Sequence, residues 1–139
     1  MTQRIREIMS TDLVTVEPLT SVVDVAQLMR REGVGDVLVV DEGHLRGLVT
    51  DRDLVIRIMA EGGNADDRTV VNACSEELIT VTPDDDVDQV IGLMRDRAVR
   101  RVPVVEGDRP VGIVSLGDLA IERDPGSALG DISAARPNE

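Results

Sequence analysis

The residue types best suited to chemistry in this chain are a hydroxyl and a carboxylate that recur at the same spacing. Thr50 and Asp53 follow the apolar run Gly47–Val49. Ser115 and Asp118 follow a second run of the same kind. Such a pair at the start of a helix is typical of a capping box, in which each side chain binds an orphan backbone N–H group. It also suits a ribose that carries a phosphate, because helix N-termini attract anions and carboxylates accept hydrogen bonds from ribose hydroxyls. Both interpretations can hold at once.

These pairs belong to an internal repeat, because the chain aligns with itself after a shift of 65 residues. The segment LVTVEP (13–18) matches LITVTP (78–83), and GLVTDRDL (47–54) matches GIVSLGDL (112–119). No insertion is needed anywhere between residues 10 and 54. Two tandem copies of one supersecondary unit explain this pattern.

Each copy predicts the element order β-α-β-β-α. A short strand ends at a Pro, an amphipathic helix follows, two strands flank a polar turn, and a second helix begins at Thr50 or Ser115. One copy alone buries too little apolar surface to be stable. We therefore expect an α/β (α+β) fold in which the two units are related by a pseudo-two-fold axis and pack through their small sheets. The predicted domains are residues 1–65, including the N-terminal segment, and residues 66–124, with a loosely ordered tail at 125–139.

The repeated elements resemble a tandem pair of CBS (cystathionine-β-synthase) domains, also called a Bateman module. The resemblance rests on the TVxP strand end, the VPVV strand and the GhV(T/S)xxD element, and it covers about Ser10 to Arg123. The chain is most similar to small stand-alone bacterial CBS-pair proteins. This resemblance implies two clefts between the repeats that frequently hold adenosine-containing ligands, and frequent assembly of two modules into a disc.

The resemblance also implies which residues contact a ligand. The acid of each recurring pair would bind ribose hydroxyls, and the Thr or Ser would face ribose or phosphate. Because the chain has no Phe, Tyr or Trp, only aliphatic side chains could sandwich an adenine. By resemblance, these are Val16, Val37, Leu38, Val81, Val102 and Pro103. For any single Val of this set, an ordinary core position is the better explanation.

Phosphate binding needs cations, and here the two copies differ. The second copy has Arg100 and Arg101 before its Val-Pro strand, where many family members place a basic phosphate contact. The first copy has Gly35 and Asp36 there, and an acidic side chain would weaken phosphate affinity. Only the first copy has an arginine, Arg52, inside its hydroxyl–carboxylate element. A solvated, salt-bridged surface would explain the same arginines, but the asymmetry predicts that the two clefts are not equivalent.

Composition argues against several other classes of function. A net charge of −12 disfavours a nucleic-acid binder, and the lack of aromatic residues removes stacking platforms for single strands. One Cys and one His cannot form a zinc site. We expect His44 in a solvated loop and Cys74 as a small buried hydrophobe rather than a nucleophile. The triple Asp at 84–86 could suggest a magnesium site, but a helix start explains it better.

The sequence therefore predicts a non-enzymatic regulatory or sensor module that binds an adenosine-containing nucleotide and signals to an unknown regulated protein. The alternative is a ligand-free structural or interaction module; no enzyme, required cofactor or metal is indicated. AMP, ADP, ATP, S-adenosylmethionine and cyclic dinucleotides all stay open as ligands. No apolar run approaches the ~20 residues of a membrane span, and the N-terminus lacks the apolar core of a secretory signal, so we expect a cytoplasmic protein. We also expect a homodimer, formed by a leftover apolar helix face with residues Leu54, Val55, Ile58, Met59, Leu119 and Ile121.

Overall fold

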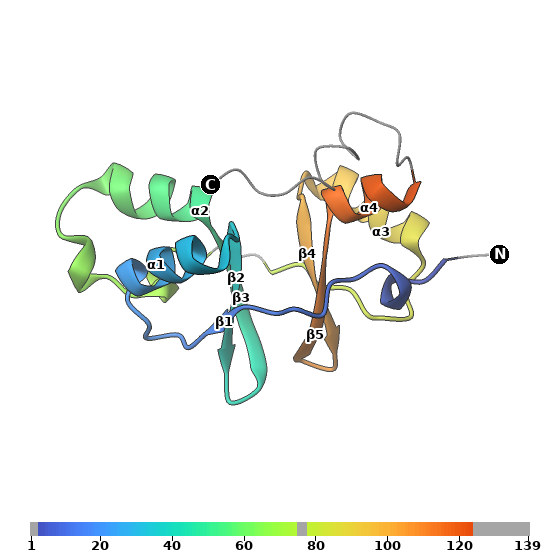
Figure 1. Cartoon of the computed structure of the whole chain (residues 1–139), viewed down its shortest axis with the longest axis horizontal. Coiled ribbons are helices and arrows are strands. Elements are labelled where there is room, and N and C mark those ends of the chain that lie inside the picture. The colour runs from blue at the N-terminus through green and yellow to red at the C-terminus, as the bar shows by residue number, and fades with distance from the viewer. Residues whose placement is uncertain (1–2, 75–77, 124–139) are drawn as a thin grey trace. The chain divides into compact units, whose positions relative to one another are not determined.

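The computed structural model of the protein describes residues 3–74 and 78–123, and it divides into two compact units. The first unit is Leu13–Leu78, and the second unit combines the described residues of 3–12 with those of 79–123. Each unit contains a small sheet with helices packed beside it (Figure 1). The predicted mixed α and β fold is confirmed. The predicted tail, 125–139, lies outside the described residues.

The first unit follows the predicted element order. Its helices and strands are β1 (Thr15–Val16), α1 (Val22–Glu32), β2 (Asp36–Asp41), β3 (His44–Thr50) and α2 (Asp51–Asp53). β1 pairs in parallel with β2, and β2 pairs antiparallel with β3. The helical segment that α2 begins continues as a π turn at Leu54–Ile58 and a 3-10 turn at Met59–Glu61. Further 3-10 turns lie at Ala65–Asp67 and Val70–Asn72.

The second unit repeats this order with one strand missing. It contains a 3-10 turn at Ile5–Glu7 and then α3 (Val87–Arg97), β4 (Arg101–Glu106), β5 (Arg109–Ser115) and α4 (Leu116–Arg123). β4 and β5 are antiparallel. The strand predicted at 78–81 is reduced to a single parallel bridge between Val81 and Val104.

A proline explains the missing strand. In the first unit the Leu38 N–H donates to the Val14 carbonyl over 2.9 Å, which extends the ladder beside β1. The equivalent residue in the second unit is Pro103, which has no N–H to donate to Ile79. The Pro103 carbonyl still accepts a hydrogen bond from the Val81 N–H at 3.1 Å. The pairing in the second unit is therefore limited to the bridge at Val81.

Both long helices begin with a side-chain cap. The Asp24 N–H donates to Ser21 Oγ over 3.1 Å at the start of α1, and Gly33 ends that helix with φ of +67°. At the start of α3 the Asp86 carboxylate accepts from the Asp88 N–H at 2.9 Å. The prediction that the triple Asp marks a helix start is therefore confirmed.

The segment that precedes each repeat in the sequence packs against the other repeat. We call residues 3–12 the first leader and residues 68–74 the second leader. The Ile5 N–H donates to the Asp85 carbonyl over 3.0 Å, and the Val70 N–H donates to the Thr20 carbonyl over 2.8 Å. These two bonds join equivalent positions of the repeats, and both Ile5 and Val70 are fully buried. Burying such a side chain stabilises the fold by roughly 1.5–3 kcal/mol.

This exchange differs from the expected assignment of the N-terminal segment to the first domain. The first leader runs beside β5, where Ser10 and Ile113 exchange both backbone hydrogen bonds at 2.8 and 2.9 Å (Figure 1). Ile5 belongs to the apolar core of the second unit. Val70 belongs to that of the first unit. Each core is thus completed by a leader from the other repeat.

Gly47 and Gly112, the first residues of the two hydroxyl–carboxylate elements, lie where a leader contacts the sheet. A Cβ on Gly47 would lie 3.1 Å from Cys74 Sγ in the second leader. A Cβ on Gly112 would lie 2.6 Å from Met9 Sδ and 3.0 Å from the Ser10 carbonyl oxygen in the first leader. Gly112 is therefore needed for the close approach of the first leader's backbone, whereas Gly47 makes room for the Cys74 side chain.

Candidate functional site

The hydroxyl–carboxylate pair of the first unit forms a reciprocal cap at the start of α2. The Asp53 N–H donates to Thr50 Oγ1 over 3.1 Å, and the Thr50 N–H donates to Asp53 Oδ2 over 2.9 Å. Thr50 is extended, as an N-cap residue should be. The second unit repeats the geometry: the Asp118 N–H donates to Ser115 Oγ at 3.1 Å, and the Ser115 N–H donates to Asp118 Oδ2 at 3.0 Å. The capping prediction is confirmed for both pairs.

The second oxygen of the two carboxylates has different surroundings. Asp53 Oδ1 lies 3.5 Å from Arg57 Nε, one helical turn further along the chain. The residue equivalent to Arg57 in the second repeat is Glu122, so the sequence offers no matching cation. Among the described residues, the hydrogen bond recorded for the Asp118 carboxylate is the one that Oδ2 accepts in the cap. The cap therefore orients both carboxylates through Oδ2.

The structure brings the arginine pair of the second unit next to its cap. The Leu116 N–H donates to the Arg100 carbonyl over 2.8 Å, and Arg101 pairs with Ser115 between β4 and β5. Arg100 is exposed and Arg101 is half-buried. Two arginines therefore lie next to the hydroxyl–carboxylate pair along the backbone, and contact of their side chains with a phosphate stays a prediction.

The equivalent place in the first unit is acidic. The Asp51 N–H donates to the Gly35 carbonyl over 2.9 Å, and Asp36 pairs with Thr50 between β2 and β3. Arg52 is exposed in the first helical turn, where its N–H donates to Asp51 Oδ1 at 2.8 Å. Asp36 and Asp51 therefore lie at the positions where the second repeat has Arg101 and Leu116, and the predicted difference in phosphate binding between the repeats stays a prediction.

The aliphatic side chains proposed as an adenine wall are largely core. Val37, Val81 and Val102 are no more than 5% exposed and belong to the apolar cores of their units. Val16 is half-buried and packs against the first core. Two further members of the set are also buried, Leu38 and Pro103. The core interpretation accounts for most of the set, and contact with an adenine stays a prediction.

The remaining titratable candidates have structural roles. Arg6 forms an ion pair with Asp84, and the Thr82 N–H donates to Asp85 Oδ2 over 2.9 Å. Cys74 is half-buried, and this burial, together with the negative charge of Asp53, raises the pKa of its thiol. A protonated, partly buried thiol is a poor nucleophile. No group of three or more His, Cys, Asp or Glu side chains among the described residues could hold a metal ion.

His44 differs from expectation, because it lies in β3 and is half-buried. The preceding turn residues, Glu42 and Gly43, have φ of +52° and +82°. Two residues with positive φ form a tight hairpin turn, so the chain re-enters the sheet at His44, paired with Asp41.

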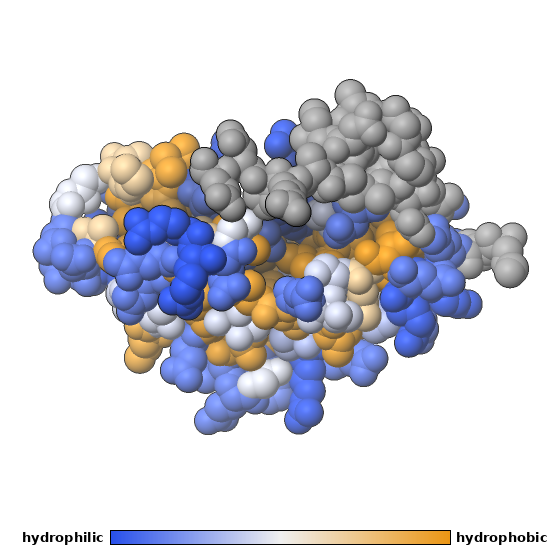
Figure 2. All heavy atoms as spheres, viewed as in Figure 1, coloured by the Kyte–Doolittle hydropathy of each residue, from blue (hydrophilic) through white to orange (hydrophobic). Residues whose placement is uncertain are grey.

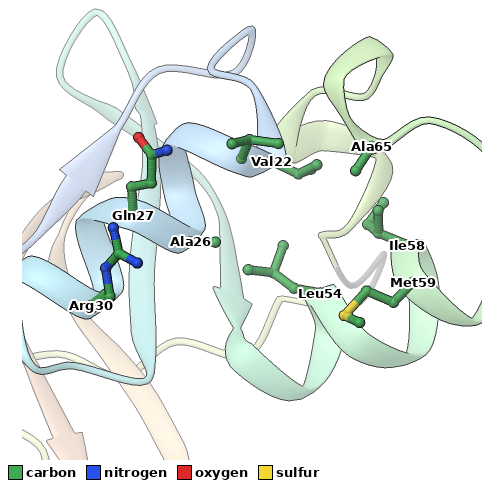
Figure 3. Close-up of a pocket in the computed structure, with 9 residues that line it drawn as sticks. Val22, Ala26, Gln27, Arg30, Leu54, Ile58, Met59 and Ala65 are labelled. Atoms are coloured by element: carbon green, nitrogen blue, oxygen red, sulfur yellow. The ribbon is translucent and has the colours of Figure 1, made fainter. Parts of the chain in front are cut away.

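Sequence reasoning missed an apolar groove in the first unit. Its cavity volume is about 290 Å³. It is lined by Val22, Val23, Ala26, Gln27, Arg30, Leu54, Ile58, Met59 and Ala65. Leu54 and Ala26 face one another across the opening, and Gln27 and Arg30 lie at one end (Figure 3). A comparison of the repeats could have indicated it, because the residue equivalent to the small Ala26 is Ile91.

The two repeats have the same structure: each has a capped strand end, and each receives a leader segment at the equivalent position. A family model of the CBS domain matches residues 5–60 and again residues 70–123. The chain belongs to the CBS domain family. No helix in the described residues is both long and apolar enough to cross a membrane.

Known CBS proteins resemble the whole of this chain. The CBS domain-containing protein YhcV of Bacillus subtilis (strain 168) is 37% identical over 134 residues, which span 93% of this chain and 94% of the relative. A proposed signal-transduction protein with CBS domains from Burkholderia ambifaria MC40-6 has a TM-score of 0.81 at 25% identity, covering 90% of this chain and 96% of that one. A hexameric CBS-CP12 protein from bloom-forming cyanobacteria has a TM-score of 0.78 at 26% identity, covering 90% of this chain and 74% of that one. These likenesses identify a CBS-pair regulatory module.

Proposed function

We propose that this CBS-pair protein is a non-enzymatic sensor that binds an adenosine-containing nucleotide at its strand-end sites, chiefly in the second repeat. The observation that carries this proposal is the Asp118 carboxylate, which its cap with Ser115 holds through Oδ2 at the strand end where Ser115 pairs with Arg101. Binding would change the conformation of the module, and a regulated protein would respond to that change.

Each group at this site suits one part of a phosphorylated nucleoside. The Asp118 carboxylate accepts hydrogen bonds from a ribose diol, and its cap with the Ser115 N–H orients it before the ligand arrives. Arg100 and Arg101 supply positive charge for phosphate oxygens. Gly117, in the first turn of α4, has no side chain that would obstruct a ligand near the backbone.

The first repeat supports phosphate binding less well. Asp36 and Asp51 would repel a phosphate near Thr50, and the Asp53 carboxylate is shared with Arg57. We therefore expect the first site to bind the same nucleotide more weakly, or to favour a ligand with less negative charge.

Thermal melting with a panel of nucleotides tests this function. A ligand that binds only the folded state raises the melting temperature, and at one hundred times its Kd it adds about 2.7 kcal/mol of stability. We expect AMP, ADP or ATP to raise the melting temperature and to be recovered unchanged. Adenosine alone should have a smaller effect, because it lacks the phosphate that the arginines would bind.

A ligand-free structural module is the second candidate, and a specific observation favours it. Both caps are complete without any ligand, so Thr50, Asp53, Ser115 and Asp118 already have a structural role. Melting temperatures that are unchanged by every adenosine nucleotide would establish this alternative. Steady release of phosphate or of a free base from a nucleotide would instead show an enzyme.

Assembly belongs to the same proposal. The hexameric relative shows that CBS proteins of this architecture can assemble. We propose a homodimer in a cytoplasmic setting, and light scattering at micromolar concentration should give about twice the monomer mass of 15.0 kDa.

A further inference from the structure

Only part of the helix face that we expected to form a dimer is exposed. Ile58 is 4% exposed and Leu119 is 3% exposed, so both belong to the cores of their own units, whereas Val55 and Met59 are exposed. Among the large hydrophobic residues that the structure describes, Leu19 has the highest exposed fraction, 80%. Leu19 follows β1, directly before the residues that bond to the second leader. The surface that receives a leader therefore has an exposed apolar residue of its own.

The two leaders dock through the same backbone contacts. The matching hydrogen bonds and antiparallel bridges lie 65 residues apart in the sequence: Val87 N–H to the Gln3 carbonyl and Val22 N–H to the Arg68 carbonyl, both at 3.0 Å, and the bridges Arg4–Asp86 and Thr69–Ser21. The backbone alone therefore cannot decide which leader docks on which repeat. Either the side chains decide this, or the covalent connection between a leader and its repeat does.

The side chains that oppose one another differ between the units. In the second unit Arg6 Nε donates to Asp84 Oδ1 over 3.0 Å, and Arg4 Nη1 donates to the Asp84 carbonyl over 2.6 Å. The same register places Val71, the equivalent of Arg6, opposite Leu19, the equivalent of Asp84. Figure 2 shows hydrophilic atoms over the 3-10 turn of the first leader and hydrophobic atoms at the lower left, over the segment between β1 and α1. An ion pair in the second unit is thus replaced by two apolar residues in the first.

Neither pair is buried, so its main effect is on selectivity. Val71 is 49% exposed, and the side chains of Arg6 and Asp84 are 51% and 68% exposed. An exposed ion pair adds little stability by itself. It can still reject a wrong partner, because a charge placed opposite an apolar group loses hydration without gaining an ion pair.

The leader residues that face the cores also differ in size. At three equivalent positions the first leader has the larger side chain: Ile5 for Val70, Ile8 for Ala73 and Met9 for Cys74. All of these residues lie in, or pack against, the core of the unit on which their leader docks. The larger leader would overpack the first unit, and the smaller leader would leave voids in the second.

We propose that the leader-docking surfaces of the two repeats are selective. The second repeat accepts a bulky apolar segment with an arginine opposite Asp84, which is the first leader. The first repeat accepts a smaller segment with an apolar residue opposite Leu19, which is the second leader. This selectivity keeps the exchange of leaders in one arrangement, although the backbone contacts of the two surfaces are the same.

Hydrogen exchange at two amides measures the docking of each leader separately. The Ile5 N–H and the Val70 N–H donate to carbonyls of the other repeat, so their exchange rates report the first and the second leader. Val71→Arg places a charge opposite Leu19, and we expect exchange at Val70 to become at least about twofold faster while Ile5 is unchanged. Adding Leu19→Asp should restore most of the protection, because the two substitutions recreate the ion pair of the second unit. Adding Leu19→Asn in its place should not.

The reverse experiment uses the second unit. Asp84→Leu leaves Arg6 opposite an apolar residue and should speed exchange at Ile5 alone, and adding Arg6→Val should restore protection by recreating the apolar pair of the first unit. Arg6→Val combined with Leu19→Asp is the matched control, because these residues lie in different units and their effects should add. Higher salt should weaken the recovery given by the new ion pair but not the recovery given by the new apolar pair.

The difference in size has its own variant. Ala73→Ile introduces the side chain of the first leader into the second, and it should speed exchange at Val70 and leave Ile5 unchanged. An Ala73→Ile chain that is as well protected as the unaltered chain would overturn the part of the proposal that concerns size.

The outcomes of the paired substitutions decide between side chains and connection. The four substituted residues, Arg6, Leu19, Val71 and Asp84, are exposed, so the variants should fold. Protection that is restored in both units supports selective surfaces. If the double variants recover none of the lost protection, the covalent connection selects the leader and the proposal is wrong. Recovery in one unit alone would overturn it as well, because the surfaces would then not be a matched pair.

Discussion

At the level of single residues, the cap uses one oxygen of each carboxylate, and the proposed ligand contact needs the other. Oδ2 of Asp53 and of Asp118 accepts the N–H of its cap partner. Oδ1 of Asp53 lies near Arg57, whereas the residue equivalent to Arg57 in the second repeat is Glu122. The capping box could be predicted from spacing alone, because it is a local interaction. The ion pair of Asp53 with Arg57 could be predicted from their i,i+4 spacing. Only the structure shows that Arg57 approaches Oδ1, the oxygen that the cap does not use.

Asparagine at these positions separates the two roles. Asp118→Asn retains an oxygen for the cap but removes the charge that favours a ribose diol. Charge-assisted hydrogen bonds contribute about 1.5–3 kcal/mol, so nucleotide affinity should fall about tenfold or more. The melting temperature without ligand should change little, because the helix-dipole contribution is under ~1 kcal/mol.

Asp53→Asn is the matched variant, and calorimetric titration should show a smaller loss of affinity for it. If both variants bind nucleotide as well as the unaltered chain while their melting temperatures fall by several degrees, the carboxylates are caps alone.

The thiol of Cys74 should make stability depend on pH in a predictable direction. Burial and Asp53 raise its pKa in the folded state. An unfolded thiol ionises near pH ~8.5 while the folded thiol stays protonated, so stability must fall as the pH rises above that value. The chain has no Lys and no Tyr, so no other side chain titrates in this range.

Urea unfolding at increasing alkaline pH measures this effect. The unaltered chain should lose more stability than Cys74→Ala between about pH 7.5 and about pH 10. Parallel losses in the two proteins would show that the thiol is not perturbed.

At the scale of elements, the repeat predicted the order of helices and strands because equivalent residues have equivalent burial. The first strand of the second repeat was the exception. Pro103 was visible in the sequence, but its effect depends on the strand register. The proline removes a hydrogen bond only because the N–H at this position would donate to the Ile79 carbonyl, as the Leu38 N–H donates to the Val14 carbonyl in the first unit. The groove was missed for a similar reason: Ala26 and Ile91 fit the same helical pattern equally well.

The glycines at the strands that contact the leaders should differ in their tolerance of alanine. A Cβ at residue 112 would lie 3.0 Å from the backbone oxygen of Ser10 and even closer to Met9 Sδ. We expect Gly112→Ala to destabilise the protein by about 1–3 kcal/mol, in the range of overpacked cores. Gly47→Ala should cost less, because it meets only the Cys74 side chain.

Denaturant unfolding compares these variants. Adding Met9→Ala to Gly112→Ala should restore part of the lost stability, since it removes the side-chain clash and leaves the backbone one. Equal stability of Gly112→Ala and the unaltered chain would contradict the close approach of the first leader.

At the scale of the whole molecule, the exchange of leaders makes each repeat depend on a segment of the other. Sequence periodicity cannot reveal this, because it shows that Ile5 and Val70 are equivalent but not which core each one enters. The predicted boundary at residue 65 divides the repeats in sequence, whereas the compact units divide them at 12 and 78.

Hydrogen exchange of two alanine variants tests this dependence. Ile5→Ala should lower protection in β4 and β5 more than in β2 and β3, and Val70→Ala should do the reverse. Truncating a buried isoleucine costs about 2–5 kcal/mol, enough to be seen clearly. Equal loss in both units for both variants would mean that the exchange does not organise stability.

The strand end of the second repeat is the proposed nucleotide site, and its backbone amides report binding directly. In an amide NMR titration with ATP, we expect the largest saturable shifts at Ser115, Leu116, Gly117 and Asp118, and smaller shifts at the equivalent residues of the first repeat, if this strand end is the nucleotide site. Amides in these segments that do not move at millimolar ATP, ADP or AMP would contradict it.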